Sequence, residues 1–237
     1  MRTPAENTTA PRATLPYLCG VAAGLLFVTA FLIEGATRAG YDPMRHPVSS
    51  LSLGPYGWTQ VANFVVTGLL MLVFAVGLRR DLRTPGRRST WGPLLIGASA
   101  IGLIGAGVFP TDPIGGYPPG TAARGVSTWQ GRLHDVPFSL LFFAALAAAC
   151  FVFARRFAGW GETGWAVYSA AGGLVFLVSF VLAGMGFSGA EGFAGLGGLM
   201  QRISIATGFC WLGLLAVHLL RTRPDPVSAR PTAADLP

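Results

Sequence analysis

Side chains that could do chemistry gather in three segments of the sequence that separate long apolar runs. They are His46, Ser49, Ser50, Asp112, His134 and Asp135. Imidazole and carboxylate groups bind zinc, and three such ligands plus a water make a hydrolytic centre. These residue types suggest a divalent metal such as zinc held by His46, Asp112 and His134. No compact metal motif such as H-E-x-x-H is present, so the ligands would come from separate loops.

A second chemistry would use a serine as nucleophile. Ser49 or Ser50 would attack, His46 or His134 would be the base, and an aspartate would orient the histidine. Such triads are recognised by geometry and not by sequence order. The chain has no G-x-S-x-G nucleophile elbow.

Each of these segments also has a structural interpretation. HPVSSLSLGPYGW is typical of a turn before a helix, with Thr59 as the N-cap. Asp112 precedes Pro113 and favours a turn. Asp135 precedes Pro137 by two residues, which predicts an N-cap with proline in the first turn. The functional and structural interpretations both remain open at this point.

Three further polar side chains are candidate ligand-binding residues, namely Glu34, Asn63 and Arg202. Charged groups at membrane depth are costly and are functional candidates by default. Arg202 lies in the apolar stretch QRISIATGF. We expect it to pair with Glu34, Asp112 or Glu191, with anion or headgroup binding as the alternative. Asn63 is expected to hydrogen-bond another helix.

The composition is that of a membrane protein. Of the 237 residues, 52% are hydrophobic and only 11% are charged, against about 25% charged in a typical soluble domain. Six apolar runs approach the roughly 20 residues that span a bilayer as a helix. They cover residues 15–33, 58–78, 91–109, 136–153, 165–185 and 199–220. We therefore predict an all-α, polytopic transmembrane bundle of six helices.

Arginine placement predicts the orientation of this bundle. Twelve arginines fall in the tails and in alternate loops, and five fall in the opposite set of loops. Because cytoplasmic segments carry the excess, both termini are predicted to be cytoplasmic, in a multi-pass protein of the inner membrane. Residues 1–14 and 221–237 are expected to be disordered tails. The basic residues are dispersed between apolar runs, so no nucleic-acid partner is expected.

Small residues recur at helical spacing within several of the runs. Gly20 and Gly24 form a G-x-x-x-G pattern, and Gly102 and Gly173 lie in similar patterns with alanine or serine. Such faces allow helices to approach closely in lipid. They predict a compact bundle.

Four segments in fixed order resemble the family known as domain of unknown function 998. They are RHPVSSLSLGPYGWTQVANF, GVFPTDP, GRLHD and GLMQRI. The matching positions are His46, Ser49, Ser50, Gly54, Gly57, Asn63, Phe109, Asp112, His134 and Arg202. The resemblance implies a six-span integral membrane protein and brings no assigned activity with it.

These observations lead to a functional expectation with two alternatives. We expect a membrane-embedded hydrolase or transferase that acts at the lipid headgroup level, with its polar groups on the outer face. The alternatives are a binding or assembly module that associates with a lipid or a membrane protein, and a small-solute transporter. The lipid bilayer is the partner common to all three.

Overall fold

The structure, a computed structural model, describes residues 14–83, 88–122 and 126–222. Its elements are α1 (Leu15–Thr37), η1 (Val48–Ser52), α2 (Gly57–Asp81), α3 (Trp91–Val108), α4 (Trp129–Leu133), η2 (His134–Ser139), α5 (Leu140–Gly159), α6 (Thr163–Ser188) and α7 (Gly197–Arg221). Both predicted tails lie mostly outside the described residues. The structure does not show which side of a membrane the termini face, so the orientation stays a prediction.

Six helices of the described chain are long and apolar enough to cross a membrane. The predicted all-α, multi-pass bundle is therefore confirmed. One of the six is a composite, because α4, η2 and α5 follow one another without a break over residues 129–159. This helix begins earlier than the sequence predicted, at Trp129. Its N-cap is Thr128, whose hydroxyl oxygen accepts the N–H of Gly131 at 3.0 Å, so Asp135 is not the cap.

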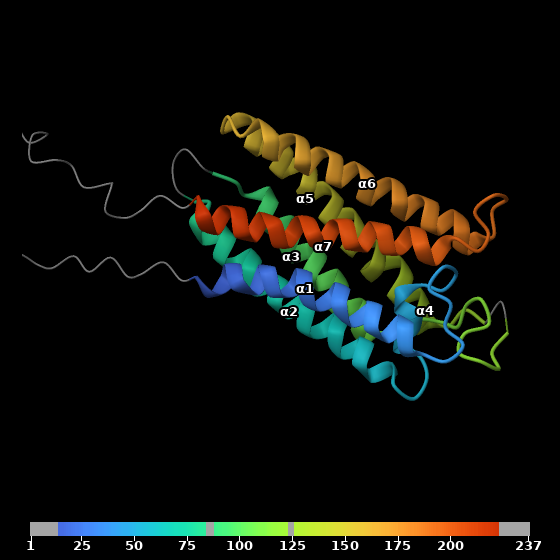
Figure 1. Ribbon diagram of the computed structural model, residues 1–237. Helices are drawn as coiled ribbons and strands as arrows, with labels where there is room; N and C mark the ends of the chain where they lie inside the picture. Colours follow the sequence, from blue (N-terminus) through green and yellow to red (C-terminus); the bar gives the residue numbers. More distant parts are fainter. Residues whose placement is uncertain (1–13, 84–87, 123–125, 223–237) are drawn as a thin grey trace, which may run out of the picture.

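The helices form a closed ring in chain order. Each long helix packs mainly against its neighbours, and α7 returns to pack against α1, as Figure 1 shows. Stacked phenylalanines fill much of the interior. Phe27 and Phe209 have ring centroids 4.6 Å apart, and Phe209 in turn stacks on Phe142 at 5.9 Å. The core is thus a column of aromatic rings that joins α1, α5 and α7.

Glycines permit the close helix contacts that the sequence predicted. A Cβ built on Gly24 would lie 2.7 Å from the carbonyl oxygen of Phe209. A Cβ on Gly102 would lie 2.6 Å from the backbone nitrogen of Phe142. Both distances are shorter than real Cβ contacts, so only glycine fits where α1 meets α7 and where α3 meets α5.

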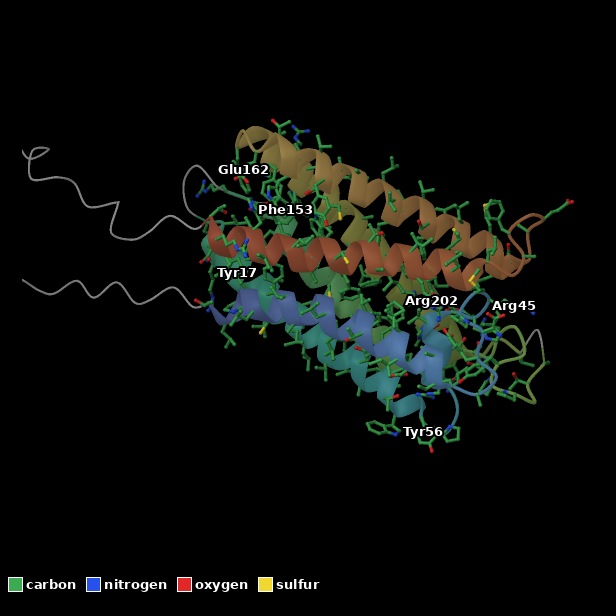
Figure 2. The ribbon with its side chains drawn as sticks, viewed as in Figure 1. Tyr17, Arg45, Tyr56, Phe153, Glu162 and Arg202 are labelled. Atoms are coloured by element: carbon green, nitrogen blue, oxygen red, sulfur yellow. The ribbon has the colours of Figure 1, made fainter. Side chains whose placement is uncertain are left out.

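We call one end of the ring the loop end. It is formed by the described residues of the segments 38–56, 109–122, 126–128 and 189–196, and it lies opposite the start of α1 and the end of α7. Arg45 and Arg202 lie at the loop end in Figure 2, whereas Tyr17 and Glu162 lie at the other. The candidate residues from all three segments therefore meet at the same end of the bundle.

Candidate functional site

A cavity of about 670 Å³ opens at the loop end, and we call it the loop-end pocket. Its apolar lining comes mainly from Phe27, Phe64, Leu103, Phe142, Phe143, Phe180 and Ile205. Its polar lining comes mainly from Ser49, Asp112, Ser127, His134, Asp135, Ser139, Ser188 and Gln201. Phe180 and Ile205 lie about two helical turns inside the ends of α6 and α7. The deeper part of the pocket is therefore apolar, and its polar side chains lie near the loop end, beside Pro47, Pro113 and Ile114.

His134 is held in one orientation in the wall of the pocket. Its Nδ1 lies 2.9 Å from the carbonyl oxygen of Phe109, and its ring packs edge-on against Phe64. Because a carbonyl oxygen can only accept, Nδ1 carries the hydrogen. In the neutral ring Nε2 is then an acceptor, and it makes no hydrogen bond within the described residues. His134 is only 2% exposed and lines the pocket.

Two carboxylates line the same pocket, and only one of them is hydrogen-bonded to the described residues. Asp112 accepts the backbone N–H of Thr128 at 2.8 Å and the Thr128 hydroxyl at 2.7 Å. Gly131 lies against the carboxylate, where a Cβ would come within 2.0 Å of Oδ2. Asp135 is exposed and makes no hydrogen bond in the described part of the chain. Both oxygens of Asp112 are thus engaged in hydrogen bonds to Thr128, whereas Asp135 is available to a ligand.

The serine cluster contributes one residue to the pocket. Ser49 lines it, whereas Ser50 is fully buried and its hydroxyl oxygen has no hydrogen-bond partner. Among the described residues, no hydrogen bond joins either serine to His46 or His134. The structure therefore brings Ser49 and His134 to one cavity without assembling the triad that the sequence allowed.

His46 bridges two loops outside the pocket. Its Nδ1 accepts the backbone N–H of Asp42 at 2.8 Å, and its Nε2 donates to the carbonyl oxygen of Gly115 at 3.2 Å. The imidazole also packs against the rings of Tyr41 and Tyr117, which contact each other. Both ring nitrogens are therefore occupied by the backbone.

The proposed metal set does not fit this arrangement. His46 has no free nitrogen, and both oxygens of Asp112 are bonded to Thr128. The described residues contain no group of three histidine, cysteine, aspartate or glutamate side chains that could hold a metal ion. A metal site made from His46, Asp112 and His134 therefore stays a prediction that the geometry of the described residues does not support.

Arg202 binds loop carbonyls where an ion pair was expected. Its Nη1 donates to the carbonyl oxygens of Pro43 at 2.6 Å, Gly198 at 3.0 Å and His46 at 3.1 Å. Its Nη2 donates to the hydroxyl of Tyr41. No carboxylate of the described chain pairs with it. The first loop, residues 38–56, instead turns the backbone oxygens of Pro43 and His46 toward the guanidinium. Arg202 does not line the pocket.

Gln201 and Leu199 complete this attachment of the first loop to α7. The Gln201 side-chain oxygen accepts the N–H of Val48 at 2.7 Å, and the N–H of Leu199 donates to the carbonyl oxygen of Met44 at 3.0 Å. We call Leu199, Gln201 and Arg202 the α7 clasp. A Cβ on Gly198 would lie 2.6 Å from the carbonyl oxygens of Pro43 and His46, so the clasp requires glycine there.

Glu34 pairs with a residue one turn along its own helix. Its carboxylate lies 3.1 Å from Arg38, which also donates to the carbonyl oxygen of Tyr56 and the hydroxyl of Thr59. Thr59 is therefore a partner of Arg38, and the N-cap position of α2 belongs to Tyr56. These contacts fix α1 to the start of α2 and place Glu34 outside the pocket lining.

Asn63 makes the predicted hydrogen bond to another helix. Its side-chain nitrogen donates to the carbonyl oxygen of Phe27 in α1 at 3.3 Å and to Gln60 at 3.2 Å. Its side-chain oxygen accepts the hydroxyl of Thr67 at 3.3 Å. Asn63 is thus part of a polar ladder on α2 and does not line the pocket.

Sequence reasoning missed Tyr41, Gln201 and the phenylalanines of the pocket. Tyr41 is buried and donates its hydroxyl to the carbonyl oxygen of Pro47 at 2.9 Å. Burial raises the pKa of Tyr41 to about 12, although the neighbouring Arg202 acts in the opposite direction. Gln201 could have been noticed in the sequence because it is adjacent to the candidate Arg202. Nothing in the sequence indicated that the phenylalanines line a pocket, because apolar residues of this kind are common throughout the spans.

Comparison with known proteins gives one match. The family described as protein of unknown function (DUF998) matches residues 21–218. No curated protein and no solved structure matches the chain. The match includes at least part of all six helices and every residue of the loop-end pocket.

Proposed function

The chain belongs to the family of proteins of unknown function DUF998, and we propose that it binds an amphiphilic membrane lipid in the loop-end pocket. The observation that carries the proposal is the gradient within this cavity of about 670 Å³, from phenylalanines inside to carboxylates and hydroxyls near the loop end. Ligand pockets usually have volumes of about 300–1,000 Å³. Each buried methylene of a chain would contribute roughly 0.8 kcal/mol.

The polar lining favours a headgroup that donates hydrogen bonds. The described lining contains two carboxylates and an imidazole with a free Nε2 acceptor, and no arginine. An anionic group beside Asp135 would be repelled by about 1–4 kcal/mol at 4 Å, depending on the effective dielectric constant. A lipid alcohol or lipid amine would instead donate to Asp135 or His134. We therefore assign the ligand to the neutral or cationic amphiphiles.

A hydrolase or transferase is the second candidate, and the tautomer of His134 favours it. With Nδ1–H held by the Phe109 carbonyl, Nε2 presents its lone pair to the pocket. A base in this state can take the proton of a bound hydroxyl group or water. This is the role that a general base has in ester hydrolysis and in group transfer to an alcohol. No metal is needed for that step.

The binding proposal can be tested with three probes that differ only in the headgroup. We would reconstitute the protein in vesicles with photoreactive sixteen-carbon chains that end in an alcohol, an amine or a carboxylic acid. The expected result is labelling of peptides that contain Phe143 or Phe180 by the alcohol and the amine, and little labelling by the acid. Equal labelling by all three probes, or labelling confined to the outer faces of the helices, would overturn the proposal.

Asp135→Asn tests the headgroup preference directly. Removing this charge should weaken labelling by the amine about tenfold, which corresponds to about 1.4 kcal/mol. It should also increase labelling by the carboxylic acid. Glu191→Gln is the matched control, because Glu191 is an exposed carboxylate at the loop end outside the pocket lining. The proposal fails if the two variants behave alike.

His134→Asn tests the second candidate. The asparagine amide can still donate to the Phe109 carbonyl, but it offers no basic nitrogen in the place of Nε2. Conversion of the alcohol probe in vesicles of native lipid, followed by mass spectrometry, should stop while labelling of the pocket persists. Conversion at the wild-type rate by this variant would exclude His134 as the base.

A further inference from the structure

The composite helix 129–159 changes its winding beside the pocket. Residues His134–Ser139 form a π-helical segment that contains Pro137. Proline has no N–H to donate and its ring crowds the preceding turn, so a regular α-helix is disfavoured here. Wider π-helical turns are frequent at functional sites. This segment, η2, carries three residues of the pocket lining, namely His134, Asp135 and Ser139.

The same segment lies apart from α6. Within the described residues, η2 packs against α3, α4 and α5 and makes at most marginal contact with α6, whereas α5 packs along α6. Figure 1 shows the same relationship, with α5 and α6 close together at the end opposite the loops and diverging toward the loop end. The ring is therefore loosely packed between η2 and α6 within the described residues, and we call this place the η2–α6 opening.

Residues on both edges of this opening line the pocket and are also exposed. Asp135 is exposed on the η2 edge, and Gly184 and Ser188 are exposed on the α6 edge. A residue with both properties marks a place where the cavity reaches the molecular surface. At Gly184 nothing lies within 4 Å of a built Cβ, so a larger side chain has room there.

The surface around the opening has the character of a membrane-facing wall. Val136 is 62% exposed and Leu140 is 50% exposed beside the η2 edge. Val181 is 54% exposed and Met185 is 38% exposed beside the α6 edge. All four lie in helices long and apolar enough to span a bilayer. Exposed apolar side chains at this depth are expected to contact acyl chains.

We infer that the gap between η2 and α6 is a lateral portal through which the lipid enters from the bilayer, an inference that rests on the proposed lipid binding. The headgroup would move past Asp135, Ser139 and Ser188, while the apolar chain passes over Gly184. A chain that enters this way stays in hydrocarbon throughout. Entry through water would expose its apolar surface, which is unfavourable.

Gly184→Trp is the variant that tests the portal. An indole in the open space at Gly184 should obstruct passage, and the helix should tolerate it because glycine is a poor helix former. Gly164→Trp is the matched control. Gly164 also lies in α6 with no atom within 4 Å of a built Cβ, but near the opposite end of the helix. Gly184→Leu is a second, smaller obstruction if the tryptophan variant does not fold.

The measurement is the rate at which the photoreactive sixteen-carbon alcohol, dissolved in vesicles, labels peptides with Phe143 or Phe180. We expect a decrease of at least tenfold for Gly184→Trp, a smaller decrease for Gly184→Leu, and the wild-type rate for Gly164→Trp. Labelling of both Gly184 variants at the wild-type rate would overturn the portal and leave the binding proposal intact. If the wild-type protein is not labelled in the pocket, the binding proposal itself fails.

Discussion

Asp112 and Thr128 are sixteen residues apart, and they are joined by two hydrogen bonds that close the second loop. The same Thr128 hydroxyl caps the composite helix by accepting the N–H of Gly131. His134 follows less than two turns later. The carboxylate that looked like a metal ligand therefore sets where the helix starts and, through it, where the imidazole lies.

Asp112→Ala should destabilise the protein by about 2 kcal/mol, because hydrogen bonds to a charged group contribute roughly 1.5–3 kcal/mol. Thermal unfolding in detergent would measure the change. In a double-mutant cycle with Thr128→Ala, the two effects should not add fully, since both substitutions remove the bond between the Thr128 hydroxyl and the carboxylate. Full additivity would contradict the pairing.

Arg202→Lys should also destabilise the protein, although it keeps the charge. A lysine ammonium lacks the planar fork that reaches several acceptors at once, so at least two of the four bonds of Arg202, three of which go to residues 38–56, are lost. We expect a loss of about 2–4 kcal/mol and faster proteolysis within residues 38–56.

Arg45→Ala is the control for the clasp. Arg45 is an exposed arginine at the same end of the bundle (Figure 2), and its side chain makes no hydrogen bond or ion pair within the described residues. Its removal should change stability by less than about 0.5 kcal/mol. An equal loss for Arg45→Ala and Arg202→Lys would show that general charge, and not the clasp, holds the loop.

The buried phenol of Tyr41 predicts a loss of stability at high pH. Its pKa is raised from 10.0 to about 12 in the folded protein, mainly by burial. The folded state therefore holds the proton more tightly than the unfolded state. Stability from this group is fully present below pH 10 and is lost as the pH rises from 10 to about 12. The loss approaches roughly 3 kcal/mol, at about 1.36 kcal/mol per unit.

Tyr41→Phe isolates that contribution. The variant loses the hydrogen bonds to Pro47 and Arg202 and should be less stable than the wild type at neutral pH. Its stability should nevertheless fall less steeply between pH 10 and 12. Chemical denaturation at several pH values would give both slopes. Identical slopes would mean that Tyr41 ionises normally in the folded protein.

The six-helix architecture could be predicted from sequence because span length and apolar composition are local properties. The composite helix shows the limit of that reasoning. Its first turns, from Trp129, are too polar to count as a span, and the side chain of Thr128 determines where they begin. The apolar run alone therefore placed the helix start at Val136, several residues late.

The candidate site was predicted only in part, because partners from distant segments decide each role. His134, Asp135 and Ser49 do line one cavity. The side chains of His46 and Arg202 could serve in catalysis, yet both are hydrogen-bonded to backbone atoms of the loops. No pattern in the sequence reports which carbonyl oxygens a loop will turn toward a guanidinium. The cavity itself depends on spacing between helices, which is not a local property.

Two glycines of opposite environment give the last prediction. At Gly24 a Cβ would lie 2.7 Å from the Phe209 carbonyl oxygen, whereas at Gly164 nothing lies within 4 Å. Gly24→Ala should therefore push α1 from α7 and destabilise the bundle by about 1–3 kcal/mol. Gly164→Ala should stabilise it by up to about 1 kcal/mol, because alanine is the better helix former. Thermal unfolding of both variants measures the difference. Shifts of the same sign would contradict the close contact of α1 and α7, which sets the position of Phe27 in the pocket wall.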